Sequence, residues 1–218
     1  MHREIDRTRL AKELKVRKIH VFPRLWSLLP REISARLASQ WEPVDRLARL
    51  LLKMPVGALL FLLNSPTGVF IIHPSETRYV PGPVAAGKTR AENGVFASVQ
   101  SLLDDEAAVL RAIAGLYDHL LGSMGAADGP RLSDGVGITP AWTEVGAQIV
   151  RLFPLGHNPD PICRRSPADY FAQSLALYTA EPRALNVADP NMHKLLQRSF
   201  FSETFWRRTD AEQSERVS

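Results

Sequence analysis

The sequence predicts a helix-dominated α+β domain that contains a small β-hairpin or sheet. Two amphipathic helices are clearly marked in the second half of the chain, at 104–121 and at 166–178. Two short apolar runs, 58–63 and 68–72, flank a turn of sequence NSPTG and have the length of strands. The chain has 218 residues, of which 45% are hydrophobic and 23% charged, which is typical of one globular domain of medium size.

The helix at 166–178 has the most complete set of boundary signals. Ser166 is a favourable N-cap and Pro167 suits the first helical position, where a missing N–H costs nothing. Asp169 follows the cap by three residues and is placed to complete a capping box. The helix is expected to end before Pro182. Its apolar face is formed by Phe171, Leu175 and Tyr178.

The helix at 104–121 begins with three acidic residues, which favour the positive end of a helix dipole, and Gly122 is expected to close it. Its core face consists of apolar residues at helical spacing. Three other residues fall in line on the opposite side of the helix, at i, i+4 and i+7: Arg111, Gly115 and Asp118.

The apolar runs at 58–63 and 68–72 are predicted to form a buried hairpin, with helix as the alternative for 58–63. Residues 77–80 are predicted as another short strand, followed by a loop at 81–87 that is rich in Gly and Pro. The segment 25–52 has helical periodicity and is expected to break near Glu42-Pro43.

The excess positive charge of the chain lies in its first 18 residues. They hold seven Lys or Arg and three Asp or Glu, so their net charge is 7 − 3 = +4, equal to that of the whole chain. A basic helix at 3–18 could hold an anionic partner such as nucleic acid, lipid or an acidic protein, or could simply be solvated. The expected organisation is a basic helical N-terminal extension at 1–53, a main domain at 54–206 and a disordered tail at 207–218.

The single cysteine, Cys163, excludes an internal disulfide and fits a reducing compartment. The apolar segment 54–72 is interrupted by Pro, Asn and Gly, so no membrane-spanning helix is expected. No signal peptide is evident, which favours a cytoplasmic location and leaves non-classical export open.

One motif suggests nucleotide chemistry. The sequence from Gly82 to Thr89 matches the phosphate-binding pattern G-x-x-x-x-G-K-[ST] through Gly82, Gly87, Lys88 and Thr89. Such a loop would bind ATP or GTP with magnesium, with Lys88 on the phosphates and Thr89 on the metal. A turn-rich loop without a ligand is the competing interpretation.

A second pattern carries a family resemblance. The segment SPADYFAQSLALYTAEPRALNVADPNMHKLL resembles the C-terminal part of the anthrax lethal factor-like zinc metallopeptidases. Upstream, RAIAGLYDHLLG at 111–122 occupies the place of the family motif HExGHxxDHLLG, and its last five residues fit well. The resemblance covers about 95–196 and implies a zincin-like catalytic-domain fold.

The resemblance also implies that the metal site is degenerate. The positions that correspond to the family's site are Arg111, Ala112, Gly115, Asp118, Asp169 and Gln173. Arg111 and Gly115 replace the two zinc-binding histidines, and Ala112 replaces the catalytic glutamate. Asp169 replaces the third ligand and Gln173 a second glutamate. Because hydrolysis needs three ligands and a base, the expected protein has no bound cofactor and is non-catalytic.

Its expected role is to bind a protein or peptide partner through the former active-site cleft, with Arg111 paired to Asp169 or Asp118 in place of the metal. His119 and His157 are expected at the surface. A rebuilt zinc site of His119, His157 and Asp169, and hence an active metallopeptidase, is the alternative.

Overall fold

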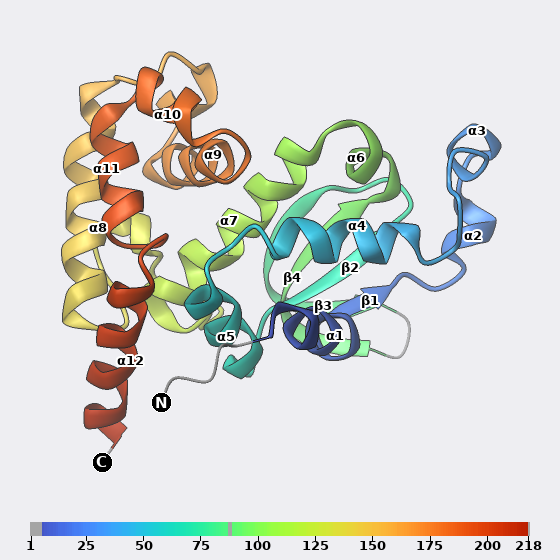
Figure 1. Ribbon diagram of the computed structural model, residues 1–218, viewed down its shortest axis with the longest axis horizontal. Helices are drawn as coiled ribbons and strands as arrows, with labels where there is room; N and C mark the ends of the chain where they lie inside the picture. The colour runs from blue at the N-terminus through green and yellow to red at the C-terminus, as the bar shows by residue number, and fades with distance from the viewer. Residues whose placement is uncertain (1–5, 87–88, 218) are drawn as a thin grey trace.

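The computed structural model describes residues 6–86 and 89–217. Helices dominate it, and one small mixed β-sheet lies beside them (Figure 1), which confirms the predicted α+β class.

The sheet has four strands in the order β1-β2-β4-β3. Their bounds are β1 (Ile19–Val21), β2 (Val69–His73), β3 (Arg78–Ala86) and β4 (Thr89–Ser98). β1 and β4 flank β2 in parallel, and β3 runs antiparallel to β4. β3 is therefore an edge strand, so one side of its backbone is not paired within the sheet.

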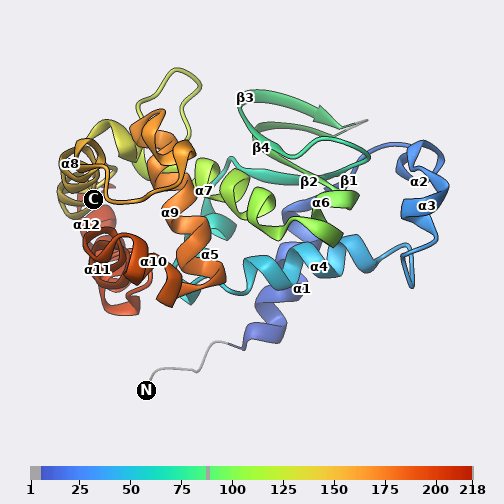
Figure 2. The ribbon, with the colours of Figure 1, turned by 90° about the horizontal axis from the view of Figure 1, so that it is seen from above.

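The N-terminal half contains α1 (Arg7–Arg17), α2 (Leu25–Leu28), α3 (Arg31–Ser34), α4 (Glu42–Leu51), α5 (Val56–Asn64) and α6 (Val99–Asp104). The C-terminal half contains α7 (Glu106–Ser123), η1 (Leu132–Asp134), α8 (Pro140–Leu152), η2 (Phe153–Leu155), η3 (Pro161–Arg164), α9 (Pro167–Ala180), α10 (Pro182–Ala188), α11 (Pro190–Arg198) and α12 (Glu203–Val217). Figure 2 shows α1 and α4 on one side of the sheet, and α7 running from the sheet toward the C-terminal helices.

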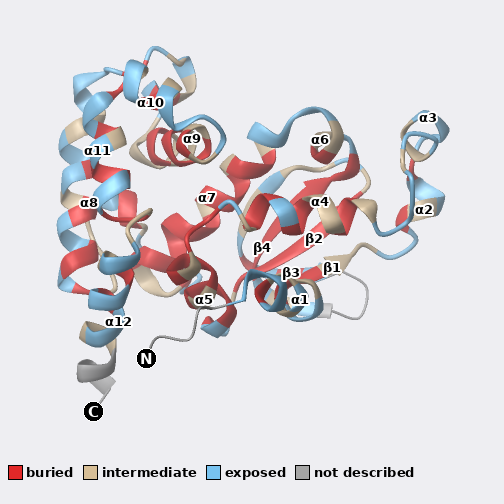
Figure 3. Cartoon of the chain, viewed as in Figure 1, coloured by how far each residue is buried: buried red, intermediate tan, exposed pale blue. Residues whose placement is uncertain are grey.

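One hydrophobic core joins the two halves. It includes side chains from α1 through α12, for example Leu14, Phe70, Ile113, Leu175 and Trp206. Figure 3 shows the burial concentrated in β2, β4, α7 and the facing sides of the C-terminal helices. α7 is buried over most of its circumference because the sheet lies on one side of it and α9 and η1 lie on the others.

The predicted hairpin between 58–63 and 68–72 is wrong. Residues 58–63 lie in α5, as in the alternative interpretation, whereas 68–72 mainly form β2, whose two neighbours are β1 and β4. The observed hairpin is β3–β4, and it includes residues 81–86 of the predicted loop. Prolines are tolerated there because β3 is an edge strand with a register shift between Val80 and Pro83.

Three further boundaries differ from the prediction. The segment 25–52 is divided into α2, α3 and α4; the start of α4 at Glu42 confirms the expected break near Glu42-Pro43, whereas the division into α2 and α3 was not predicted. The segment 1–53 is not purely helical, because it contributes strand β1 to the sheet. Helix α7 continues through Gly122 to Ser123, and Met124 at its C-cap adopts the left-handed conformation.

The predicted disordered tail is also wrong for its described part. Residues 207–217 belong to α12, whose Trp206 is 1% exposed and packs on Phe61, Trp142 and Phe200. Gly57 of α5 permits this contact, since a Cβ there would lie 2.4 Å from the Trp206 side chain. The aromatic side chains order the helix because they bury a large apolar area.

Within the described residues, no single helix is long and apolar enough to cross a membrane. α4 and α5 meet that criterion only as a pair, and they are bent by 116°.

Candidate functional site

A cleft of about 330 Å³ opens between the start of β3, the middle of α7, η3 and the first turns of α9. It is lined by Thr77, Arg78, Tyr79, Ala108, Arg111, Ala112, Gly115, Arg131, Ile162, Arg165, Ala168, Asp169 and Ala172. The packing of α7 against α9 thus brings together four of the positions singled out in the sequence: Arg111, Ala112, Gly115 and Asp169.

The link between α7 and α9 at this point is a hydrogen bond between side chains. Arg111 Nη1 donates to Gln173 Oε1 at 3.3 Å, and Gln173 Nε2 donates to Asp160 Oδ2 at 2.7 Å. Across the described part of the chain, Arg111 forms no ion pair with Asp169 or Asp118. The predicted Arg111–carboxylate pair is therefore wrong, and the guanidinium binds a neutral amide.

Asp169 serves the start of α9. Its backbone N–H donates to Ser166 Oγ at 3.0 Å, which confirms Ser166 as the N-cap. The Asp169 carboxylate accepts a hydrogen bond from the Ser166 hydroxyl at 3.0 Å, so it is paired with the cap's side chain. Asp169 therefore both stabilises the N-terminus of α9 and lines the cleft.

Asp118 does not belong to the cleft. It is completely buried and accepts hydrogen bonds from Ser133 N at 2.8 Å and Ser133 Oγ at 2.7 Å. Burial raises the pKa of this carboxyl to about 7, although both Ser133 hydrogen bonds act in the opposite direction. Asp118 was expected in the same site as Arg111 and Gly115, but η1 covers its side of α7 and separates it from the cleft.

His119 is also buried, contrary to the expected surface position. Its Nε2 lies 2.7 Å from the carbonyl of Ala126, which can only accept, so Nε2 carries the hydrogen and Nδ1 accepts from Tyr79 Oη at 2.5 Å. Burial lowers the pKa of His119, which favours the neutral ring. His157, in contrast, is exposed.

The donor set does not fit a zinc ion. Both ring nitrogens of His119 are occupied, and the described residues contain no group of three or more His, Cys, Asp or Glu that could hold a metal. In the cleft itself, Arg111 has no lone pair to donate, and Ala112 and Gly115 have no ligand atoms in their side chains. Asp169 is the one carboxylate among the lining residues.

The nucleotide-binding interpretation is contradicted by the β3–β4 hairpin. Gly82 lies within β3 and Thr89 begins β4, whereas a phosphate-binding loop connects a strand to a helix. Gly87 and Lys88 lie outside the described residues. The hairpin geometry at Gly82 and Thr89 therefore gives no support to ATP, GTP or magnesium binding at this motif.

The basic residues of α1 are largely engaged by the protein itself. Lys15 Nζ lies 2.6 Å from Asp45 Oδ1, and Arg17 Nη2 donates to the Leu63 carbonyl at 2.9 Å. Lys18 is buried and donates to the Ser65 carbonyl at 2.8 Å, and burial lowers its pKa to about 8. Much of the positive charge at 7–18 thus docks α1 and the residue after it onto α4 and α5. The anionic partner stays a prediction.

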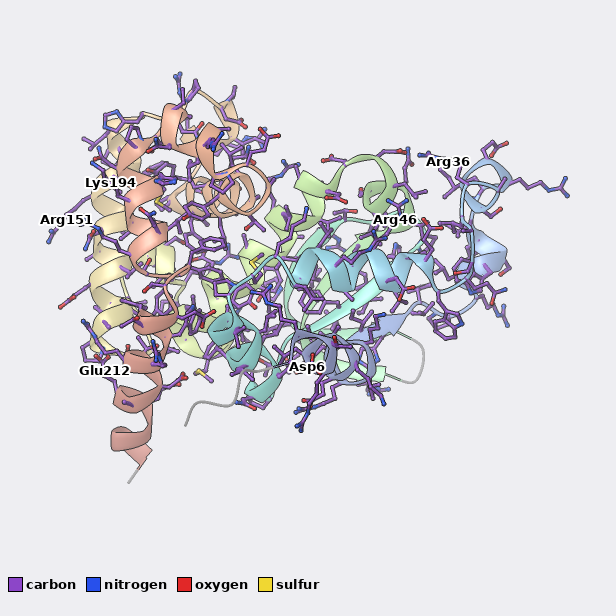
Figure 4. All side chains as sticks on the ribbon, viewed as in Figure 1. Asp6, Arg36, Arg46, Arg151, Lys194 and Glu212 are labelled. Carbon is purple, nitrogen blue, oxygen red and sulfur yellow. The ribbon has the colours of Figure 1, made fainter. Side chains whose placement is uncertain are left out.

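A second cavity, of about 400 Å³, lies between α8, α11 and α12. Arg151 and Lys194 line it, and Figure 4 shows them on neighbouring helices at the far end of the molecule from Arg36.

Tyr79, Arg131 and Arg165 are among the cleft residues that were not identified from the sequence. Tyr79 lies in a predicted strand, Arg131 in a glycine-rich loop and Arg165 directly before the cap of α9. No local pattern connects them, because they meet only through the packing of β3, α7 and α9. No protein-family model, curated protein or solved structure matches this chain.

Proposed function

We propose that this protein is a non-catalytic relative of the lethal factor-like zinc metallopeptidases and that it binds a short extended segment of a protein or peptide in the cleft. The observation that carries the proposal is that the first residues of the edge strand β3, Arg78 and Tyr79, line the cleft. Arg111, Ala112, Gly115 and Asp169, which the resemblance assigned to the metal site, all line it.

The side chains present support binding without hydrolysis. Peptide hydrolysis by a zincin needs three metal ligands and a general base beside the metal-bound water. Arg111 remains protonated, Ala112 cannot transfer a proton, and Gly115 offers only backbone atoms. The cleft is therefore bounded by β3, α7 and α9, but its side chains lack the metal ligands and the general base that would activate water.

The edge strand supports an extended ligand. A peptide that adds a strand to a sheet edge gains backbone hydrogen bonds, while neighbouring pockets select its side chains. In β3 this is possible at 78–80, since Pro81 and Pro83 have no N–H to donate. Arg78 and Tyr79 are the strand residues that line the cleft, and Thr77 directly before the strand lines it too. A ligand of a few residues fits this short stretch.

A binding selection from a library of short random peptides tests the proposal. The selected peptides should bind the wild-type protein and lose roughly tenfold or more in affinity to Ala168→Trp, whose indole would fill the cleft. Asn186→Trp, on the exposed face of α10, is the matched control and should bind normally. Selection of no peptide, or unchanged binding by Ala168→Trp, would contradict the proposal.

A further inference from the structure

Positively charged side chains outnumber negatively charged ones in the lining of the cleft. Arg78, Arg111, Arg131 and Arg165 line it together with the carboxylate of Asp169. The guanidinium of Arg78 is already engaged, because it pairs with Glu76 at 2.9 Å and lies 5.7 Å from the ring centroid of Phe96. Three guanidinium groups and one carboxylate remain, a difference of 3 − 1 = +2.

The positive charges of these three guanidinium groups are not neutralised by carboxylates of the residues that the structure describes. Within the described part of the chain, Arg111, Arg131 and Arg165 take part in no ion pair. Arg111 has the neutral amide of Gln173 as its partner, and Asp169 is bonded to the Ser166 hydroxyl. The charge of Arg131 also acts on the buried Asp118, but that carboxylate is bonded to Ser133 and does not line the cleft.

We infer that the cleft selects a ligand with an anionic oxygen group, carboxylate or phosphate, on the side chain that enters it. A guanidinium presents a planar set of N–H donors that matches both groups, and charge-assisted hydrogen bonds of this kind are about twice as strong as neutral ones. Arg111 and Arg131 are partly buried, so water screens them less than it would screen surface arginines. The inference rests on the proposed function, since it specifies the peptide that the cleft binds.

Three fluorescent peptides that differ at one central position test this selectivity. Their shared sequence is Ala-Val-X-Val-Ala, with Glu, phosphoserine or Gln at X, and binding is measured by fluorescence anisotropy at low salt. The Glu or the phosphoserine peptide should bind roughly tenfold or more tightly than the Gln peptide. Tight binding of phosphoserine alone identifies phosphate as the ligand group, and tight binding of Glu identifies carboxylate.

Two charge-removing variants connect the selectivity to the cleft. Arg131→Gln and Arg165→Gln should lose most of the preference for the anionic peptides. Arg164→Gln is the matched control, because Arg164 is exposed like its neighbour Arg165 but does not line the cleft. Circular dichroism of each variant shows whether it is folded, and high salt should weaken binding of the anionic peptides most.

Equal binding of all three peptides would overturn the inference and leave the proposed function in place. If none of the peptides binds, the protein is titrated with inorganic phosphate and with acetate, and the arginine side-chain NMR signals are followed. This experiment distinguishes a failure of the anion site from a failure of the proposed peptide binding. Shifts of Arg131 and Arg165 at millimolar anion would support the anion site and contradict peptide binding. An absence of such shifts would contradict both.

Discussion

Tyr79 Oη donates a hydrogen bond to His119 Nδ1 at 2.5 Å, and this bond joins the edge strand β3 to helix α7. His119 is fixed in turn by the Ala126 carbonyl. Tyr79 also lines the cleft, so the position of the strand relative to the helix depends on this partly buried pair. Burial raises the pKa of Tyr79, which keeps its hydroxyl protonated as the donor.

We expect Tyr79→Phe to lower the free energy of unfolding by about 1–2 kcal/mol, because His119 Nδ1 would be left buried without a donor. Urea denaturation followed by circular dichroism measures the change. Tyr178→Phe is the control, since in the described structure the Tyr178 hydroxyl has no hydrogen-bond partner. Equal losses in both variants would show that the Tyr79 hydroxyl has no special role.

Asp118 should make stability depend on pH. Its pKa rises from an ordinary 3.8 to about 7 in the folded protein, so between these values the folded state binds more protons than the unfolded state. The contribution of Asp118 is fully present below about pH 4 and is lost as the pH rises through about 7. Replacement by Asn removes the titration but retains a side-chain oxygen for Ser133.

The unfolding free energy of Asp118→Asn relative to wild type should therefore rise by about 2–3 kcal/mol between pH 5 and pH 8. Denaturation curves at both pH values test this. Asp134→Asn, at an exposed position nearby, should show no comparable trend. A constant difference between Asp118→Asn and wild type would show that the carboxyl titrates normally.

The family proposal predicts a gain of metal binding. Wild-type protein purified with zinc in the buffer should contain no stoichiometric zinc by mass spectrometry. The double variant Arg111→His/Gly115→His places two imidazoles beside Asp169 and should bind about one zinc ion per chain if the helices retain zincin geometry. A Cβ at Gly115 would lie 3.3 Å from Tyr79 Cβ, so a small adjustment of β3 is required. The control Arg111→Ala/Gly115→Ala should bind none.

Helix α12 should be essential for stability. Trp206 Nε1 donates to the Phe200 carbonyl at 2.7 Å, and its ring lies 5.0 Å from that of Trp142 between centroids. Trp206→Ala should cost about 3–5 kcal/mol of unfolding free energy through the cavity it leaves. The neighbouring exposed Arg207→Ala should cost less than about 0.5 kcal/mol. A small effect of Trp206→Ala in thermal denaturation would indicate that the C-terminal helix is dispensable.

The predicted helices were reliable where their signals are local. The capped start at Ser166 and the end of α9 before Pro182 both occur as expected, since they depend on residues within one turn of each boundary. The strands were less predictable. The apolar run of α5 suits a helix or a strand equally well, and the prolines of β3 are acceptable only at a sheet edge.

The sequence alone determined the α+β class, the capped helices α7 and α9, and the lack of zinc-binding side chains at 111, 112 and 115. Tertiary structure decided which strands pair, that Asp118 and His119 are buried, and that Arg111, Arg131 and Arg165 line the same cleft. The physical reason is the range of the interactions. Caps and side-chain chemistry depend on adjacent residues, whereas burial and convergence depend on partners from distant segments, which become neighbours only when α7 packs against α9 and β3.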